Sequence, residues 1–140
     1  MPKITVGLPI YNEQKHISEA IESLKGQTYA DFDVFISDNC STDATSAICR
    51  EKIGNDRRFR FSSHSRNLGA ASNFEHAFRV SDREYFAWLG GHDFISHDFL
   101  KTLSFILDES NQTSMAFCDT CGIDGLSNEV RFPRCARAES

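Results

Sequence analysis

Short apolar runs alternate with amphipathic patterns along most of this chain. Apolar and β-branched residues predict strands at 4–8, 32–37, 59–62, 85–89 and 115–118. Apolar residues recur at helical spacing after residues 12, 42, 69 and 98, and they predict four helices. Pro9 is expected to end the first strand because proline has no N–H to donate to a neighbouring strand. This alternation predicts an α/β fold with a mainly parallel sheet and helices on both faces.

One apolar run ends abruptly in residues that carry chemistry. Residues 85–89 are followed by Gly90, Gly91, His92 and Asp93, and a run of this kind predicts a buried strand of a parallel sheet. The next loop then lies at the carboxyl edge of the sheet, where ligands bind in open α/β proteins. The glycines would let a ligand approach the backbone, and His92 with Asp93 offers a metal ligand and a charge. The alternative is a glycine turn followed by two solvated polar residues.

Two further polar clusters, residues 11–13 and 38–43, also follow predicted strands. Parallel topology brings all three clusters to one edge, where carboxylates can accept hydrogen bonds from a nucleotide. The chain has no glycine-rich phosphate loop of the dinucleotide or P-loop type, so phosphates bound there would need a metal. Asn12, Ser41 and Thr42 have an alternative role as helix caps. For Asp38 a functional role is favoured over a capping role, because Ser41 or Thr42 can already cap the following helix.

Composition and charge narrow the classes of function. The net charge of −5 over 140 residues argues against a nucleic-acid partner, which requires a basic face. No apolar stretch approaches the roughly 18 residues that span a bilayer, and no signal peptide precedes the first strand, so a cytoplasmic location is expected. Five irregularly spaced cysteines indicate reduced thiols. The single C-x-x-C at Cys118 and Cys121 lacks the second pair that a zinc site needs.

Several motifs, in the right order and spacing over about residues 3–120, resemble the glycosyltransferases of family 2. Residues 9–13 (P-I-Y-N-E) match the P-x-Y-N-E opening of the family, and residues 20–24 and 27–29 match its following helix and Q-T-Y turn. Residues 37–43 (S-D-N-C-S-T-D) are similar to V-D-D-G-S-T-D, and residues 67–73 are similar to the segment N-x-G…R-N. The resemblance implies a GT-A type, Rossmann-like nucleotide-binding half.

The resemblance also implies how a nucleotide-sugar donor is held. The expected donor-binding residues are Pro9, Tyr11, Asn12, Glu13, Asp38, Asn67 and Gly69. A divalent cation, Mn²⁺ or Mg²⁺, would lie where the family has L-D-x-D-D. Here Gly90 and His92 replace the first two aspartates of that motif, which leaves His92 and Asp93 as the metal ligands. Two lost carboxylates imply weak metal binding.

The resemblance implies transfer of a sugar, with inversion, from a UDP-, GDP- or dTDP-linked donor to a carbohydrate or lipid-linked acceptor in polysaccharide biosynthesis. Family members continue into an acceptor-binding half that carries the general base, so we expect residues 1–121 to be a truncated donor-binding domain. Residues 122–140 would be a tail, either a hairpin arm or a disordered end. Neither Asp119 nor Asp124 is identified as the base. The alternative is a degenerate, non-catalytic module that binds a nucleotide or a partner.

Two expectations about location and assembly complete this interpretation. The protein is expected in the cytoplasm, with peripheral attachment at the inner face of the membrane as an option. If the strand that ends at Trp88 lacks covering elements, the chain is expected to dimerise or to take up a partner chain that supplies the missing half.

Overall fold

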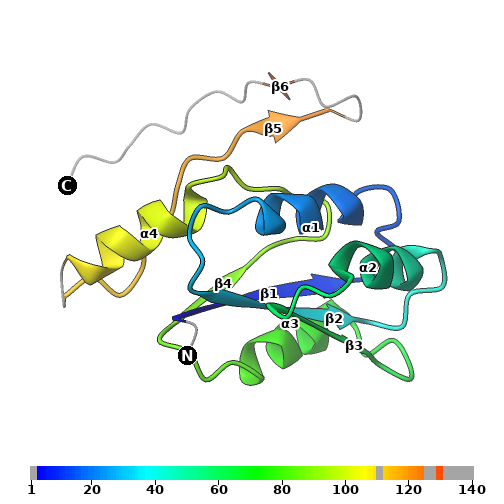
Figure 1. The fold of residues 1–140 in the computed structure, drawn as a ribbon. Coiled ribbons are helices and arrows are strands. Elements are labelled where there is room, and N and C mark those ends of the chain that lie inside the picture. Colours follow the sequence, from blue (N-terminus) through cyan, green and yellow to red (C-terminus); the bar gives the residue numbers. More distant parts are fainter. Residues whose placement is uncertain (1–2, 110–111, 125–128, 131–140) are drawn as a thin grey trace.

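A parallel four-stranded sheet forms the centre of the protein in a computed structural model (Figure 1), which describes residues 3–109, 112–124 and 129–130. The sheet has the order β3-β2-β1-β4. Its strands are β1 (Ile4–Ile10), β2 (Phe32–Asp38), β3 (Phe59–Ser63) and β4 (Tyr85–Trp88). The helices are α1 (Ile17–Lys25), α2 (Thr45–Ile53), α3 (Ala70–Arg79) and α4 (Phe99–Asp108). The predicted α/β fold is therefore confirmed.

Helices cover both faces of this sheet, with α1 and α2 on one side and α3 on the other (Figure 1). Alternation along β1 and β2 points one set of apolar side chains toward α1, where they form the core. The buried core residues of these three elements are Ile4, Val6, Leu8, Ile10, Ile17, Ala20, Ile21, Leu24, Phe32, Val34 and Ile36. On the opposite face α3 approaches closely at Gly7, where a β-carbon would lie 3.2 Å from Cβ of Ala77.

The strand β4 lies at the edge of the sheet, so the prediction that it is buried was wrong. It pairs only with β1 among the described residues, and Trp88 is 52% exposed. The ring of Trp88 contacts those of Phe74 and Phe78, and all three side chains are exposed. These side chains lie outside the core because no described element covers the outer side of β4. The strand β3 lies at the other edge of the sheet.

Pro9 does not end β1, which continues to Ile10. The carbonyl of Gly7 accepts the N–H of Leu89 at 3.0 Å, so the backbone at Gly7 faces β4. The backbone at Pro9, two residues further, faces the same way. The strand β4 ends at Trp88, so it has no paired residue opposite Pro9. The missing N–H of Pro9 therefore removes no hydrogen bond between β1 and β4.

The fifth predicted strand, residues 115–118, is not formed. This segment belongs to neither a helix nor a strand, and Phe117 is 84% exposed. An apolar run becomes a strand only when a neighbour accepts its hydrogen bonds, and none of the described strands lies beside it. The tail instead forms a short antiparallel pair between β5 (Gly122–Ile123) and β6 (Glu129–Val130). The remainder of the predicted tail, residues 131–140, lies outside the described residues.

Two sequence expectations concern the thiols and the membrane. Four cysteines, Cys40, Cys49, Cys118 and Cys121, are free thiols, whereas Cys135 lies outside the described residues. Burial raises the pKa of the Cys49 thiol to about 12, with a further contribution from Asp38. Within the described part of the chain, no helix has the length and apolar character needed to cross a membrane.

We expect the α1 side of the sheet to dominate the stability of the fold. Leu24 of α1 is 0% exposed, and the change Leu24→Ala should lower the free energy of unfolding by about 2–5 kcal/mol, since it leaves a cavity. Phe105→Ala serves as the control, because Phe105 is 61% exposed and such a surface change should cost less than about 0.5 kcal/mol. Urea unfolding of both variants measures the difference. Equal losses would contradict this assignment of the core.

Candidate functional site

The loops after β1 and β2 are joined by hydrogen bonds at the carboxyl edge of the sheet. The N–H of Asn12 donates to Oγ of Ser41 at 2.9 Å, and the N–H of Thr42 donates back to Oδ1 of Asn12 at 2.8 Å. The N–H of Glu13 donates to Oγ1 of Thr45 at 2.8 Å. Asn12 therefore does not cap α1, whose N-cap is His16 without a side-chain cap bond. Its side chain positions the neighbouring loop instead.

Asp38 ends β2 beneath these loops and is fully buried. Its Oδ1 accepts the N–H and the hydroxyl of Ser41, at 3.1 and 2.5 Å. Its Oδ2 accepts the hydroxyls of Ser46 at 2.5 Å and Ser63 at 2.9 Å. Burial alone would raise the pKa of this carboxyl, but the hydrogen bonds from the three serines outweigh it and hold the pKa below its usual value. In this conformation Asp38 anchors the edge from within.

A third loop, between β3 and α3, attaches to the same edge through asparagines. Nδ2 of Asn39 donates to Oδ1 of Asn67 at 3.0 Å, and Oδ1 of Asn39 accepts the N–H of Leu68 at 2.8 Å. Oδ1 of Asn67 also accepts the N–H of Gly69 at 2.8 Å. Gly69 has φ of 84°, a backbone conformation that favours glycine. The exposed Asn67 and Gly69 thus lie beside the loop after β2, and their role in donor binding stays a prediction.

The fourth loop, after β4, contacts the first through a hydrogen bond between two side chains. Nδ1 of His92 lies 3.1 Å from Oε1 of Glu13. Gly91 makes this approach possible, since a β-carbon there would lie 2.8 Å from Cγ of Glu13 and 2.9 Å from Cγ2 of Ile10. The hydrogen bond to Glu13 raises the pKa of His92 more than burial lowers it, and Asp93 adds to the increase. All four loops therefore meet at one edge.

Side chains on the outer surface of this edge remain available to a ligand. Tyr11 is 44% exposed, and Asn12, His92 and Asp93 are exposed as well. Pro9 is buried beneath them. Sequence reasoning missed the supporting residues Thr45, Ser46 and Ser63, and it included Asn39 and Asn73 only as members of motif segments; all five hold the loops in place. The signal that could have found them is the density of hydroxyl and amide side chains after each strand.

Among the described residues, no group of three or more histidine, cysteine, aspartate or glutamate side chains could hold a metal by itself. A β-carbon at residue 90 would lie 2.6 Å from Oδ2 of Asp93, so this carboxylate occupies the space that a side chain at residue 90 would take. His92 and Asp93 are neighbours in the loop, and Mg²⁺ is often held by one or two protein ligands together with substrate phosphates. The donor set therefore fits a cation that binds together with a diphosphate.

Comparisons with known proteins give matches that cover most of this chain. The profile of glycosyl transferase family 2 matches residues 5–132. Chondroitin synthase of Escherichia coli is 34% identical over 119 residues, which are 84% of this chain and 17% of that protein. An uncharacterized glycosyltransferase of Haemophilus influenzae is 29% identical over 87% of this chain and 50% of its own length. This chain thus spans half or less of the length of these relatives.

A solved structure gives the same result for the fold. Residues 1–349 of Staphylococcus aureus TarS, in complex with UDP-GlcNAc, align with a TM-score of 0.72 and 27% identity. The alignment covers 91% of this chain and 41% of the TarS chain. TarS is a poly(ribitol-phosphate) beta-N-acetylglucosaminyltransferase.

We expect Cys40→Gly to stabilise the protein. Cys40 has φ of 64°, in the left-handed region that costs a residue with a β-carbon about 1–2 kcal/mol, and it occupies the glycine position of the family motif. Relief of this strain should raise the free energy of unfolding by about 1 kcal/mol. Asn12→Gly is the control: Asn12 has φ of 54°, but its side chain accepts the Thr42 N–H, so its loss should destabilise. A loss of stability in Cys40→Gly would refute the assignment of strain.

The buried carboxylate should make stability sensitive to acid. The pKa of Asp38 is lowered in the folded protein, against about 3.9 in the unfolded chain. Its contribution is therefore complete above the unfolded value and is lost as the pH falls through the folded one. Asp38→Asn should cost about 1–3 kcal/mol at neutral pH and flatten the acid limb of stability. Chemical unfolding over a pH series measures this, with Asp119→Asn, at an exposed carboxylate, as the control. An unchanged acid limb in Asp38→Asn would refute the role of Asp38.

Proposed function

Because this chain belongs to glycosyl transferase family 2, we propose that it binds a nucleotide-sugar donor at the carboxyl edge of its sheet and contributes to transfer of the sugar with inversion. The acceptor would be a carbohydrate or a lipid-linked carbohydrate, in the synthesis of a polysaccharide. The observation that carries the proposal is the meeting of four loops at this edge, three of them bearing the family motifs. The likeness to TarS, solved with UDP-GlcNAc, supports it and favours a UDP-linked donor.

The first loop would recognise the nucleobase and the ribose. Tyr11 offers an exposed aromatic ring for stacking, and the backbone of Asn12 and Glu13 is fixed by the second loop. Asn67 and Gly69 would border the donor on the side of β3. The role we propose for Asp38 is to hold the second loop in the shape that binds the donor, because both of its oxygens already accept hydrogen bonds from serines.

We propose that His92 and Asp93 hold a divalent cation together with the diphosphate oxygens of the donor. A carboxylate is a usual ligand for Mg²⁺ and Mn²⁺, and imidazole is an acceptable one for Mn²⁺. The cation would neutralise the charge that develops on the leaving diphosphate. Glu13 would orient the imidazole through its contact with Nδ1. A cytoplasmic site of action, with peripheral attachment to the membrane, stays a prediction of the sequence.

Isothermal titration of the purified chain with UDP, GDP, dTDP and their sugars, with and without Mn²⁺, tests the donor site. We expect one nucleotide class to bind, with Mn²⁺ increasing the affinity. Binding without sugar transfer, when the full complement of acceptors is supplied, would favour the alternative of a nucleotide-binding module. A folded chain that binds none of these ligands would contradict the donor site itself.

Tyr11→Ala should weaken the binding of that nucleotide about 10-fold or more, because the stacking of a base on an aromatic ring is lost. Thermal stability should change little, since Tyr11 is exposed. Phe105→Ala, which removes an exposed ring far along the chain on α4, is the matched control and should bind as the unmodified protein does. Equal affinity of the two variants would exclude Tyr11 from the site.

A further inference from the structure

Four arginines gather at the amino edge of the sheet, opposite to the candidate donor site. They line a hollow of about 570 Å³ together with two aspartates; the lining residues are Ala30, Asp31, Phe32, Asp33, Arg57, Arg58, Arg60 and Arg83. The arginines come from two segments: residues 57–60, which run from the preceding loop into β3, and the loop before β4. The hollow is distant from the donor site, because β2 has seven residues and spans about 20 Å at about 3.3 Å per residue.

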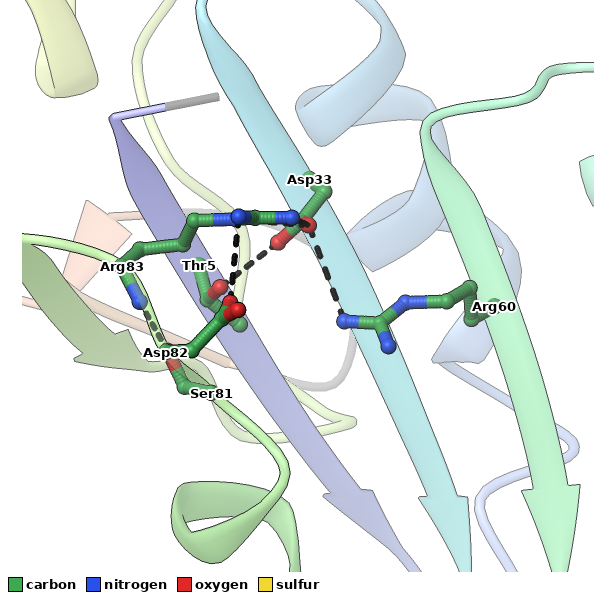
Figure 2. Close-up of polar contacts among 6 residues, drawn as sticks. All are labelled: Thr5, Asp33, Arg60, Ser81, Asp82 and Arg83. Atoms are coloured by element: carbon green, nitrogen blue, oxygen red, sulfur yellow. Dashed lines mark hydrogen bonds and ion pairs between the residues drawn. The ribbon is translucent and has the colours of Figure 1, made fainter. Parts of the chain in front are cut away.

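Two of these arginines are held firmly by carboxylates. Arg58 donates to both oxygens of Asp56, at 3.0 and 2.7 Å, and its guanidinium lies over the ring of Phe32. Arg83 pairs with Asp82 at 3.1 Å and with Asp33 at 3.4 Å. Asp33 is buried and accepts the hydroxyl of Thr5 at 2.6 Å. Figure 2 shows Arg83 and Arg60 reaching the Asp33 carboxylate from its two sides.

The other two arginines, Arg57 and Arg60, form no side-chain hydrogen bond among the described residues. Arg60 approaches Oδ2 of Asp33 only to 3.6 Å and is 49% exposed in its side chain, so this ion pair is longer than a hydrogen bond. Arg57 is exposed and has no ion pair within the described part of the chain. A guanidinium carries five N–H donors. Among the described residues, those of Arg57 and Arg60 form no hydrogen bond to a side chain, and Arg60 makes only the long ion pair with Asp33.

We propose that this hollow, which we call the arginine hollow, binds a phosphate group through Arg57 and Arg60, with Arg58 and Arg83 fixing its shape. A phosphate offers three or more acceptor oxygens and up to two negative charges, which match the paired donors of guanidinium groups. The net charge of the chain is −5, so the concentration of arginines here is local and does not follow from a basic protein. The proposal is independent of the proposed function at the other edge.

The charge of Asp31 supplies a sharp test. Asp31 is exposed and lines the arginine hollow, so its carboxylate opposes a bound anion. Asp31→Asn should therefore tighten phosphate binding, and Arg57→Gln or Arg60→Gln should weaken it about 10-fold. Arg79→Gln is the matched control, because Arg79 lies on α3 and pairs with Glu75. If the arginines only form ion pairs within the fold, these four variants would bind phosphate alike.

The experiment is a titration of the full chain with inorganic phosphate, observed through the side-chain Nε–H signals of arginine in NMR spectra. A second arm uses vesicles of phosphatidylcholine with and without phosphatidic acid, at matched concentrations of accessible phosphate. Binding of either probe that falls in Arg57→Gln and rises in Asp31→Asn supports the proposal. Preference for the phosphatidic acid vesicles identifies a lipid headgroup as the source of the phosphate. Preference for the soluble ion excludes a lipid headgroup as that source. No binding of either probe at millimolar phosphate, or equal binding by Arg57→Gln and Arg79→Gln, overturns it.

Arg60→Gln carries a risk to folding, since Arg60 lies near the buried Asp33. Arg57→Gln avoids this risk because Arg57 is exposed and forms no ion pair among the described residues. Circular dichroism checks that each variant is folded. Titration with the nucleotide that binds the unmodified chain should give the same affinity in Arg57→Gln, which separates a failure of the arginine hollow from a failure of the donor site.

Discussion

A carboxylate buried at the end of a central strand is stable only when its oxygens are hydrogen-bonded, and Asp38 meets this requirement with groups from three segments. Ser41 comes from the loop after β2, Ser46 from the first turns of α2 and Ser63 from the end of β3. The carboxylate therefore fixes where these segments lie relative to β2. Because the loop after β1 bonds to the loop after β2, the position of Tyr11 and Asn12 depends on Asp38 as well.

The alternation of strands and helices could be predicted because each element has a strong period of its own. Residues 4–8 alternate or are β-branched, and residues 17, 20, 21 and 24 recur at helical spacing. The confirmed parallel sheet also explains why clusters from different parts of the sequence share one edge. At these positions the local sequence pattern was enough to predict the element, because the same residues are buried by helix packing and strand pairing in the fold.

The parts that could not be predicted depend on what lies beside a residue in space. Trp88 lies in an apolar run of the sequence, but its burial depends on a second neighbour on the outer side of β4. No described strand lies on that side, and Trp88 is exposed. Pro9 continues its strand because β4 stops two residues earlier in register. The role of Asp38 in donor binding stays a prediction, but its burial could not be predicted, because it depends on serines that come 3, 8 and 25 residues later. No periodicity reports such contacts.

The outer edge of β4 is unpaired in the described fold. An edge strand presents a row of unpaired N–H and C=O groups, and natural proteins protect such edges with charges, bulges or covering elements. Here the strand is Tyr85-Phe86-Ala87-Trp88, with exposed rings of Phe74 and Phe78 beside it. The unpaired side of such a strand can accept another strand, so β4 is the place in the described fold where a second chain could extend the sheet.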